Sequence, residues 1–196
     1  MQAQAMISLL KTPAQVIYTQ DNLFASVNLA QIADETGWLS FLPHDINSGR
    51  NSYNIYGIKG VGSAGSVSCY TQEDYGGKWV TILAQFAAYD SYLQSMQGRV
   101  TFLHANSRYA PVFAAKDAYA QAYALQDCGW ATDPQYAQKI IAVINEFGLT
   151  KYDKKIKIKP QKYNVVSGWF DGLRQAQAGA ARINKLTGYH SVAEKA

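Results

Sequence analysis

Apolar residues recur at helical spacing in several parts of this chain. Leu29, Ile32 and Ala33 occupy positions i, i+3 and i+4, which predicts a helix over Leu23–Glu35 with one buried face. Gly37 follows two residues later and is typical of the glycine that ends a helix in a left-handed conformation. The pattern therefore predicts a buried helix whose last turn carries an acidic residue.

Other segments show the same helical character. A first helix is predicted over residues 6–18, interrupted or restarted at Thr12-Pro13 and ended by Asp21-Asn22. Asp133-Pro134 has the residue types of an N-cap followed by a first helical position. The further helices are predicted over residues 91–103, 114–128, 134–147 and 165–186.

The segment from Pro43 to Gly77 differs from the helices around it because turn residues dominate it. Three short pieces within or just after it resemble strands, namely Tyr53–Ile58, Val67–Thr71 and Trp79–Phe86. We therefore expect an α+β protein with a mainly helical body and a small β lobe inserted between helices.

Composition limits the class of protein. The chain has 196 residues, enough for one well-buried domain plus an appendage, and 48% hydrophobic with 16% charged residues is typical of a globular protein. No stretch approaches the roughly 20 apolar residues of a membrane-spanning helix.

The first residues of the chain lack the basic start and the long apolar run of a signal peptide. We therefore expect no conventional signal peptide, and export by another route or release as a phage or effector protein.

Charge divides the chain into two parts. Residues 1–150 carry 8 Lys and Arg against 11 Asp and Glu, a net charge of −3, whereas residues 151–196 carry 10 against 3, a net charge of +7. This predicts a body over residues 1–150 and a basic linker with a C-terminal helical extension over 151–196. The lysines of Lys151–Lys162 suit contact with an anionic polymer of the cell wall, with no nucleic acid expected. A solvated linker or a lysine-guarded edge strand explains them equally well.

Glu35 is the first candidate for acid chemistry. A carboxyl in the last turn of a helix lies near the negative end of the helix dipole, which disfavours its ionised form. Apolar neighbours, for which Trp38 and Phe41 are the candidates, would raise its pKa further by desolvation. A carboxyl protonated near neutral pH suits a glycosidase that donates a proton to a leaving oxygen. An ordinary solvated Glu at a helix end fits these residues as well.

Glu73 is the candidate for a second carboxylate. It lies just before a glycine turn in the predicted β lobe, and Asp74 beside it is a rival for the same role. A helix-end acid facing a carboxylate on a β lobe is the general layout of lysozyme-like enzymes, and the cleft between body and lobe gives a substrate its place.

Metal and thiol chemistry find little support in the sequence. His44, His104 and His190 have no companion residues at the spacing of a zinc site, so we expect no metal and no cofactor. Cys69 and Cys128 are too few for a disulfide scaffold, although the sequence leaves their pairing open.

Six sequence blocks occur in a recognisable order between about residues 12 and 147. They are L-A-Q-I-A-D-E-T-G-W, N-I-Y-G-I-K-G, T-Q-E-D-Y-G-G, F-A-A-Y-D-S-Y, N-S-R-Y-A-P-V and C-G-W-A-T-D-P-Q-Y-A-Q-K-I. Together they resemble glycoside hydrolase family 73, the peptidoglycan N-acetylglucosaminidase domain of flagellar rod-cap proteins and bacterial autolysins. The resemblance implies a lysozyme-like α+β fold and hydrolysis of the β-1,4 bond after N-acetylglucosamine in glycan strands, in the periplasm or cell wall.

The resemblance also implies roles for individual residues. Glu35 matches the family's general acid, and Glu73 matches its second carboxylate on the β lobe, although Asp74 stands where the family usually has Tyr. The mechanism it implies is inverting, or assisted by the acetamide of the substrate. A muramidase on the same fold and a non-catalytic glycan-binding module are the alternatives.

Trp130 departs from the family pattern, which usually has a Tyr whose hydroxyl supports the substrate's acetamide. Its indole can stack on a sugar or donate through its N–H, but it has no hydroxyl, so Tyr109 or Tyr136 is the candidate for that group. The expected substrate-binding residues are Trp38, Asn54, Tyr56, Tyr109, Trp130 and Tyr136.

Overall fold

The computed structural model describes residues 2–74 and 76–158 of the chain. The chain divides into two compact units, Met1–Ile156 and Lys157–Ala196, and every element given below lies in the first of them. The helix predicted over residues 165–186 lies outside the described residues.

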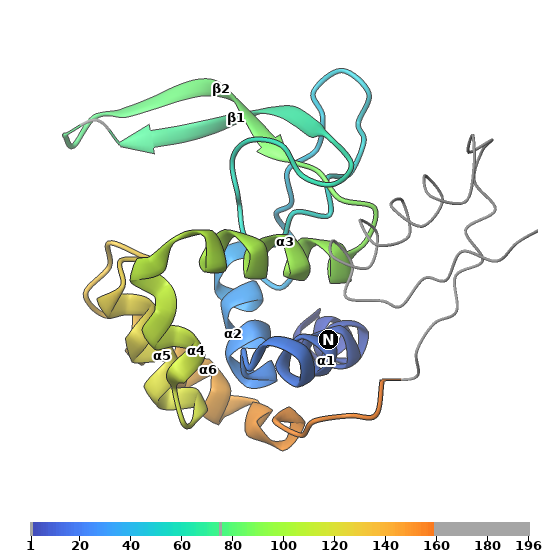
Figure 1. The fold of residues 1–196 in the computed structure, drawn as a ribbon. Coiled ribbons are helices and arrows are strands. Elements are labelled where there is room, and N and C mark those ends of the chain that lie inside the picture. The colour runs from blue at the N-terminus through green and yellow to red at the C-terminus, as the bar shows by residue number, and fades with distance from the viewer. Residues whose placement is uncertain (1, 75, 159–196) are drawn as a thin grey trace, which may run out of the picture. The chain divides into compact units, whose positions relative to one another are not determined.

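The first unit consists of helices and one two-stranded antiparallel sheet, which confirms the predicted α+β class (Figure 1). In chain order the elements are α1 (Gln2–Asp21), α2 (Ala25–Thr36), β1 (Ser66–Asp74), β2 (Trp79–Ala87), α3 (Tyr92–Ala105), the 3-10 turn η1 (Ser107–Tyr109), α4 (Ala110–Ala114), α5 (Ala118–Asp127), α6 (Tyr136–Glu146) and the 3-10 turn η2 (Leu149–Tyr152).

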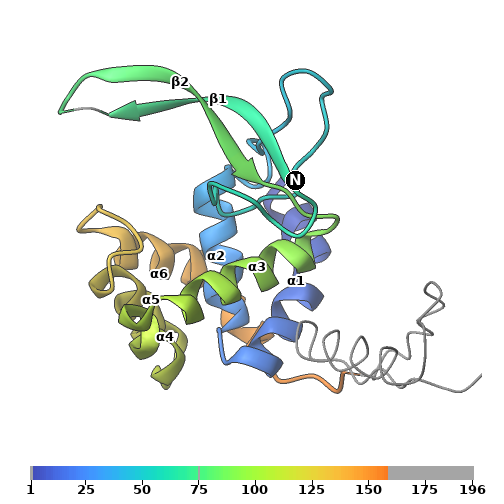
Figure 2. The ribbon, with the colours of Figure 1, turned by 45° about the horizontal axis from the view of Figure 1, so that its top comes forward.

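Helix α2 lies at the centre of the helical body, where it contacts α1, α5, α6 and η2 (Figure 2). Ten of its twelve residues are buried. The buried set includes Leu29, Ile32 and Ala33, as the helical spacing predicts, and removal of these side chains from water stabilises the fold. It also includes Asn28 and Gln31, which a purely apolar core would not contain.

The end of α2 follows the prediction closely. Gly37 is the C-cap residue, with φ of +53°, and its N–H donates to the carbonyl of Ala33. A residue with a Cβ is strained at this φ, and a Cβ here would also lie 3.0 Å from the Phe41 ring. The glycine thus ends the helix one residue after Glu35–Thr36 and leaves the acid in its last turn.

Three predicted helix boundaries are wrong. Helix α1 runs without interruption through Pro13, because its buried face continues on both sides of the proline at Leu10 and Ala14 and packing holds the helix together. Helix α5 begins only at Ala118, where Asp117 caps it. Helix α6 begins two residues after Pro134.

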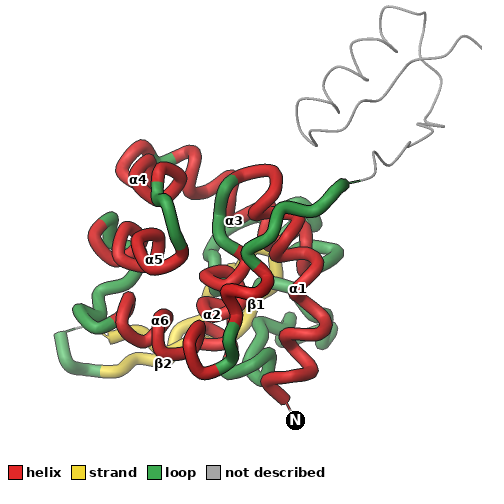
Figure 3. The backbone as a smooth tube through the Cα atoms, turned by 90° about the horizontal axis from the view of Figure 1, so that it is seen from below, coloured by secondary structure: helices red, strands yellow, loops and turns green. Residues whose placement is uncertain are grey.

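The β lobe forms where it was predicted, with β1 and β2 paired from Ser66↔Ala87 to Asp74↔Trp79 (Figure 3, strands in yellow). The strand predicted over residues 53–58 is wrong, since this segment is a turn. The buried Asn54 side chain organises it. Its amide donates to the carbonyls of Ile58 (2.8 Å) and Ala87 (3.0 Å), while its oxygen accepts from the Ile58 N–H (3.1 Å).

The chain just after η2 closes the body by capping α2. The Asp153 carboxylate accepts from the backbone N–H of Ser26 at 2.8 Å and from its hydroxyl at 2.7 Å. Phe24, the N-cap residue of α2, has no side-chain acceptor for the free N–H groups at the start of the helix. Asp153, 127 residues beyond Ser26, provides that acceptor instead.

We predict that Asp153→Ala lowers the free energy of unfolding by about 1–2 kcal/mol, because two donors at the start of α2 lose their acceptor. Thermal or urea unfolding followed by circular dichroism measures this change. Lys154→Ala is the matched control, since the neighbouring side chain is exposed. Equal stability of the two variants would contradict the capping role.

Candidate active site

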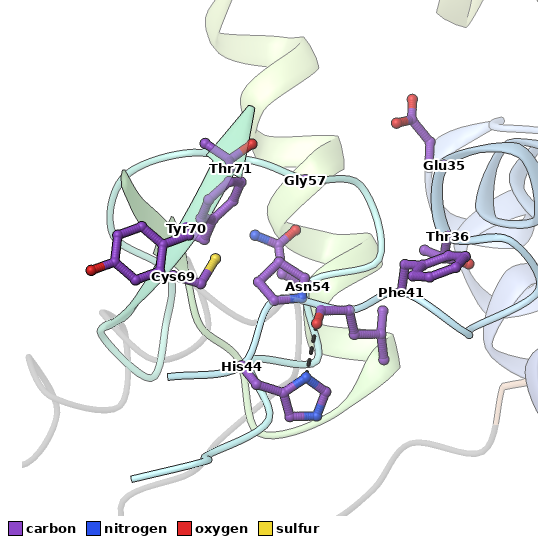
Figure 4. A pocket seen from close by; sticks show the side chains of 12 residues that line it. Glu35, Thr36, Phe41, His44, Asn54, Gly57, Cys69, Tyr70 and Thr71 are labelled. Atoms are coloured by element: carbon purple, nitrogen blue, oxygen red, sulfur yellow. Dashed lines mark hydrogen bonds between the residues drawn. The ribbon is translucent and has the colours of Figure 1, made fainter. Parts of the chain in front are cut away.

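A pocket of about 280 Å³ lies between the end of α2 and the β lobe. Figure 4 shows Glu35 and Thr36 on one side of it and Cys69, Tyr70 and Thr71 of β1 on the other. The remaining lining residues are Phe41, Leu42, Pro43, His44, Asn54, Gly57 and Phe86. The pocket thus lies between the helical body and the sheet, where the sequence predicts a cleft.

Glu35 lies at the wall of this pocket with its side chain exposed toward solvent. The protein packed around the base of the side chain still removes water from the carboxyl, and this desolvation raises the pKa of Glu35 above its ordinary value of 4.5. The hydrogen bond from Trp130 lowers the pKa, the nearby charge of Asp34 raises it, and the charge of Arg99 lowers it. Desolvation outweighs the rest, so the carboxyl keeps its proton to higher pH than a solvated Glu.

Trp130 is the aromatic residue in contact with the acid. Its indole N–H donates to Oε1 of Glu35 at 3.3 Å, across 95 residues of sequence. The rings of Tyr56, Phe102 and Tyr109 surround the indole, with centroids 6.1–6.5 Å away, and all three meet it edge-on. These contacts hold the indole in one orientation against the carboxyl.

A buried polar network lies beneath Trp130. The guanidinium of Arg99 donates to the side-chain oxygens of Asn28, at 2.7 Å, and Gln31. The Tyr56 hydroxyl donates to the same Asn28 oxygen at 3.0 Å, and the Gln31 amide donates to the Tyr136 hydroxyl at 2.5 Å. Burial raises the pKa of Tyr56 to about 12 and also raises that of Tyr136, so both phenols are neutral.

Glu73 lies on β1, two residues beyond Thr71, which lines the pocket. Side chains alternate along a strand, so Glu73 shares the face of Cys69 and Thr71. Its carboxylate forms an ion pair with the ammonium of Lys59 at 2.7 Å, and both side chains are partly exposed. The pair fixes the carboxylate on the lobe side of the site, although Glu73 itself does not line the pocket.

The structure gathers four of the six expected substrate-binding residues around the acid. Tyr56, Tyr109, Trp130 and Tyr136 all belong to the aromatic and polar layer beneath Glu35. The Tyr109 hydroxyl accepts from Arg108 at 2.8 Å, and the Tyr136 hydroxyl accepts from Gln31, so protein donors already occupy both.

The other two lie elsewhere or serve the scaffold. Trp38 packs edge-on against Phe147, with ring centroids 4.6 Å apart, and is not among the pocket-lining residues. The aromatic contact that the acid makes is with Trp130 instead. Asn54 lines the pocket, but its amide is engaged by the turn that it organises.

Sequence reasoning missed Arg99 and its amide partners Asn28 and Gln31. The helical spacing of Met96, Arg99 and Val100 contained a signal, because it places the arginine on the buried face of α3. A charged residue at such a position needs buried partners, which could have directed attention to the polar residues of α2.

Candidate metal ligands and thiols are described over residues 2–74 and 76–158. This part of the chain contains no group of three or more His, Cys, Asp or Glu side chains that could hold a metal ion. Cys69 and Cys128 are both free thiols. None of the helices described here is long and apolar enough to cross a membrane.

Comparison with known proteins agrees with this geometry. A family model described as glucosaminidase, mannosyl-glycoprotein endo-beta-N-acetylglucosaminidase, matches residues 11–149. The peptidoglycan hydrolase FlgJ of Escherichia coli is 38% identical over 146 residues, which are 74% of this chain and 46% of the relative. The exo-glucosaminidase LytG of Bacillus subtilis is 32% identical over 156 residues, 77% of this chain and 54% of the relative. The chain therefore spans about half the length of the curated relatives it matches.

Solved structures confirm the predicted lysozyme-like fold. A truncated glycoside hydrolase domain of FlgJ from Salmonella typhimurium superposes with a TM-score of 0.64 at 34% identity, covering 74% of this chain and 97% of that domain. Because the family model covers well over half of the chain, the chain belongs to the glucosaminidase family, the glycoside hydrolase family 73 that the six sequence blocks indicate.

Proposed function

We propose that this chain is a peptidoglycan hydrolase that cleaves the β-1,4 bond after N-acetylglucosamine in glycan strands, with Glu35 as general acid. The observation that carries the proposal is a carboxyl with a raised pKa on the wall of a pocket between two lobes. Relatives named as a peptidoglycan hydrolase and an exo-glucosaminidase support the substrate class. A substrate of this kind places the activity in the periplasm or cell wall.

In the proposed reaction Glu35 donates its proton to the glycosidic oxygen as the bond between that oxygen and the anomeric carbon breaks. Water supplies the hydroxyl that ends on the anomeric carbon. The carboxylate left on Glu35 then accepts the Trp130 indole N–H, a hydrogen bond that strengthens when the acceptor is charged. Trp130 therefore stabilises the state of the acid that forms during the reaction.

We propose Glu73 as the second carboxylate. In an inverting reaction it takes the proton of the attacking water, and its place on β1 two residues beyond the pocket-lining Thr71 supports this role. In a reaction assisted by the substrate's acetamide it stabilises positive charge instead. Lys59 holds the carboxylate through their ion pair and has to release it, at least in part, for either role.

We further propose that the lysines within Lys151–Lys162 contact anionic cell-wall polymers, an assignment that rests on the composition of this segment. Residues 159–162 lie outside the described residues, whereas Lys154, Lys155 and Lys157 lie within them and are exposed.

Glu35→Gln is predicted to lower the rate of glycan cleavage at least 1000-fold, on the order of what removal of a proton donor costs. Purified sacculi are digested with each protein, and the released muropeptides are identified by mass spectrometry. Glu146→Gln, also at the end of a helix, is the matched control and keeps wild-type activity.

A folded Glu35→Gln protein with full activity would contradict the assignment. Reducing ends of N-acetylmuramic acid in the wild-type digest would instead identify a muramidase, and no products at all would identify a glycan-binding module.

Glu73→Gln is predicted to lower kcat by about 100-fold with little change in KM, because the neutral amide can neither accept a proton nor balance positive charge. Lys59→Met, which frees the carboxylate from its ion pair, retains most activity. The anomer of the first product, measured by NMR, separates an inverting reaction from an acetamide-assisted one. Wild-type kcat in Glu73→Gln would remove this residue from the mechanism.

If these lysines contact the cell wall, their replacement should weaken binding to sacculi at low salt. The test uses the inactive Glu35→Gln protein, with and without the combined substitutions Lys154→Gln, Lys155→Gln and Lys157→Gln. The difference should vanish at about 0.5 M salt, where charges are screened. Substitution of the exposed Lys78 and Lys116 by Gln provides the control, since they lie outside this segment. Equal binding of all three proteins at low salt would remove the proposal.

A further inference from the structure

Arg99 is among the largest fully buried side chains of the described residues, with 1% of its surface exposed. It lies on α3, and its guanidinium lies next to the ring of Trp130. Burial of a cation is costly unless other groups replace the water that it loses, and a hydrophobic residue of similar size often stabilises a core as well or better. The arginine at this position therefore calls for an explanation beyond packing.

The partners of Arg99 are all uncharged. Two guanidinium nitrogens donate to the amide oxygens of Asn28 and Gln31, and the third, Nε, has no partner. The ion pairs found within residues 2–74 and 76–158 do not include Arg99. Its positive charge is thus held in the core with no carboxylate bonded to it.

The guanidinium also lies over two aromatic rings. Its central carbon lies 4.9 Å from the centroid of Tyr56 and 5.0 Å from that of Trp130, which is cation–π geometry. Trp130 in turn donates to the carboxyl of Glu35. One continuous chain of contacts therefore links the buried charge to the candidate acid through the indole.

The charges that act on Glu35 come from few groups in the described part of the chain. Asp34, on the same helix, adds a negative charge, and Arg99 on α3 adds a positive one. The phenols of Tyr56, from the turn before the sheet, and Tyr136, from α6, are neutral because burial raises the pKa of both. Arg99 and Asp34 thus act on the acid with opposite sign.

We infer that Arg99 is a positioning residue for the proposed hydrolysis, which fixes the Trp130 indole against Glu35 and supplies buried positive charge beneath the carboxylate that forms when the proton leaves. The inference rests on the proposed function and extends it, since Arg99 is not among the residues that line the pocket. Its amide partners on α2 and its ring partners hold it in place, and the acid lies at the end of the same helix.

The test uses the basic limb of the pH profile of kcat/KM, measured on soluble peptidoglycan fragments. A general acid has to be protonated, so activity falls as the pH rises through the pKa of Glu35. Arg99→Met and Arg99→Gln remove the positive charge that lowers this pKa. The basic limb should therefore move to higher pH.

Two further variants test the sign and separate charge from geometry. Asp34→Asn removes the negative charge that raises the pKa of Glu35, so the basic limb should move to lower pH. Arg99→Lys keeps the charge but loses the planar guanidinium and its paired donors. We expect it to leave the basic limb in place and to lower kcat about tenfold at unchanged KM. Thr101→Ala, exposed on the same helix, is the control.

The outcomes discriminate between the alternatives. A wild-type basic limb in folded Arg99→Met or Arg99→Gln would overturn the inference, since a residue needed only for packing does not move it. If neither neutral variant folds, Arg99→Lys decides, and wild-type kcat there would overturn the inference. If the wild-type protein cleaves no glycan, the proposed function fails. Titration of the Glu35 carboxyl by carbon-13 NMR in the same variants then tests the charge effect without activity.

Discussion

The structure depends on one constraint, which is that a central helix buried on nearly all sides also carries polar residues that need partners. Asn28 and Gln31 on α2 find these partners in the Arg99 guanidinium, and each group satisfies the other away from water. This network fixes α2 relative to α3 and supports the rings of Tyr56 and Trp130. The Glu35 carboxyl at the end of α2 is therefore connected, through Trp130, to the same interactions that hold the core together.

Desolvation and hydrogen bonding act in opposite directions on that acid. Desolvation raises the pKa of Glu35 and so favours the protonated form, which the proposed general acid needs before the reaction. The Trp130 indole and the charge of Arg99 favour the carboxylate that remains afterwards. A carboxyl held between these influences keeps its proton to higher pH than a solvated Glu and is stabilised as a carboxylate once the proton has left, as the proposed general acid requires. The glycine at position 37 keeps it at the pocket wall by ending the helix there.

The sequence predicts the features that depend on local chemistry. Helical spacing identified the buried face of α2, and Gly37 its end, because both are set by residues a few positions apart. Asn54 shows where prediction from local sequence fails. Residues 53–58 look like a strand, but the Asn54 side chain holds them in a turn by donating to the carbonyl of Ala87, 33 residues away. The contact between Trp130 and Glu35 spans 95 residues and has no local signature. Resemblance to a family identified both residues, but only the fold brings them together.

Comparison of two pKa values in the wild-type protein tests the assignment of Glu35 as general acid. Titration of the Glu35 carboxyl by carbon-13 NMR gives its pKa, and the basic limb of the pH profile of kcat/KM on peptidoglycan fragments gives that of the essential acid. If Glu35 is the general acid, the two values coincide and lie above the ordinary value of 4.5. An ordinary pKa for Glu35, or a basic limb set by another group, would contradict that assignment.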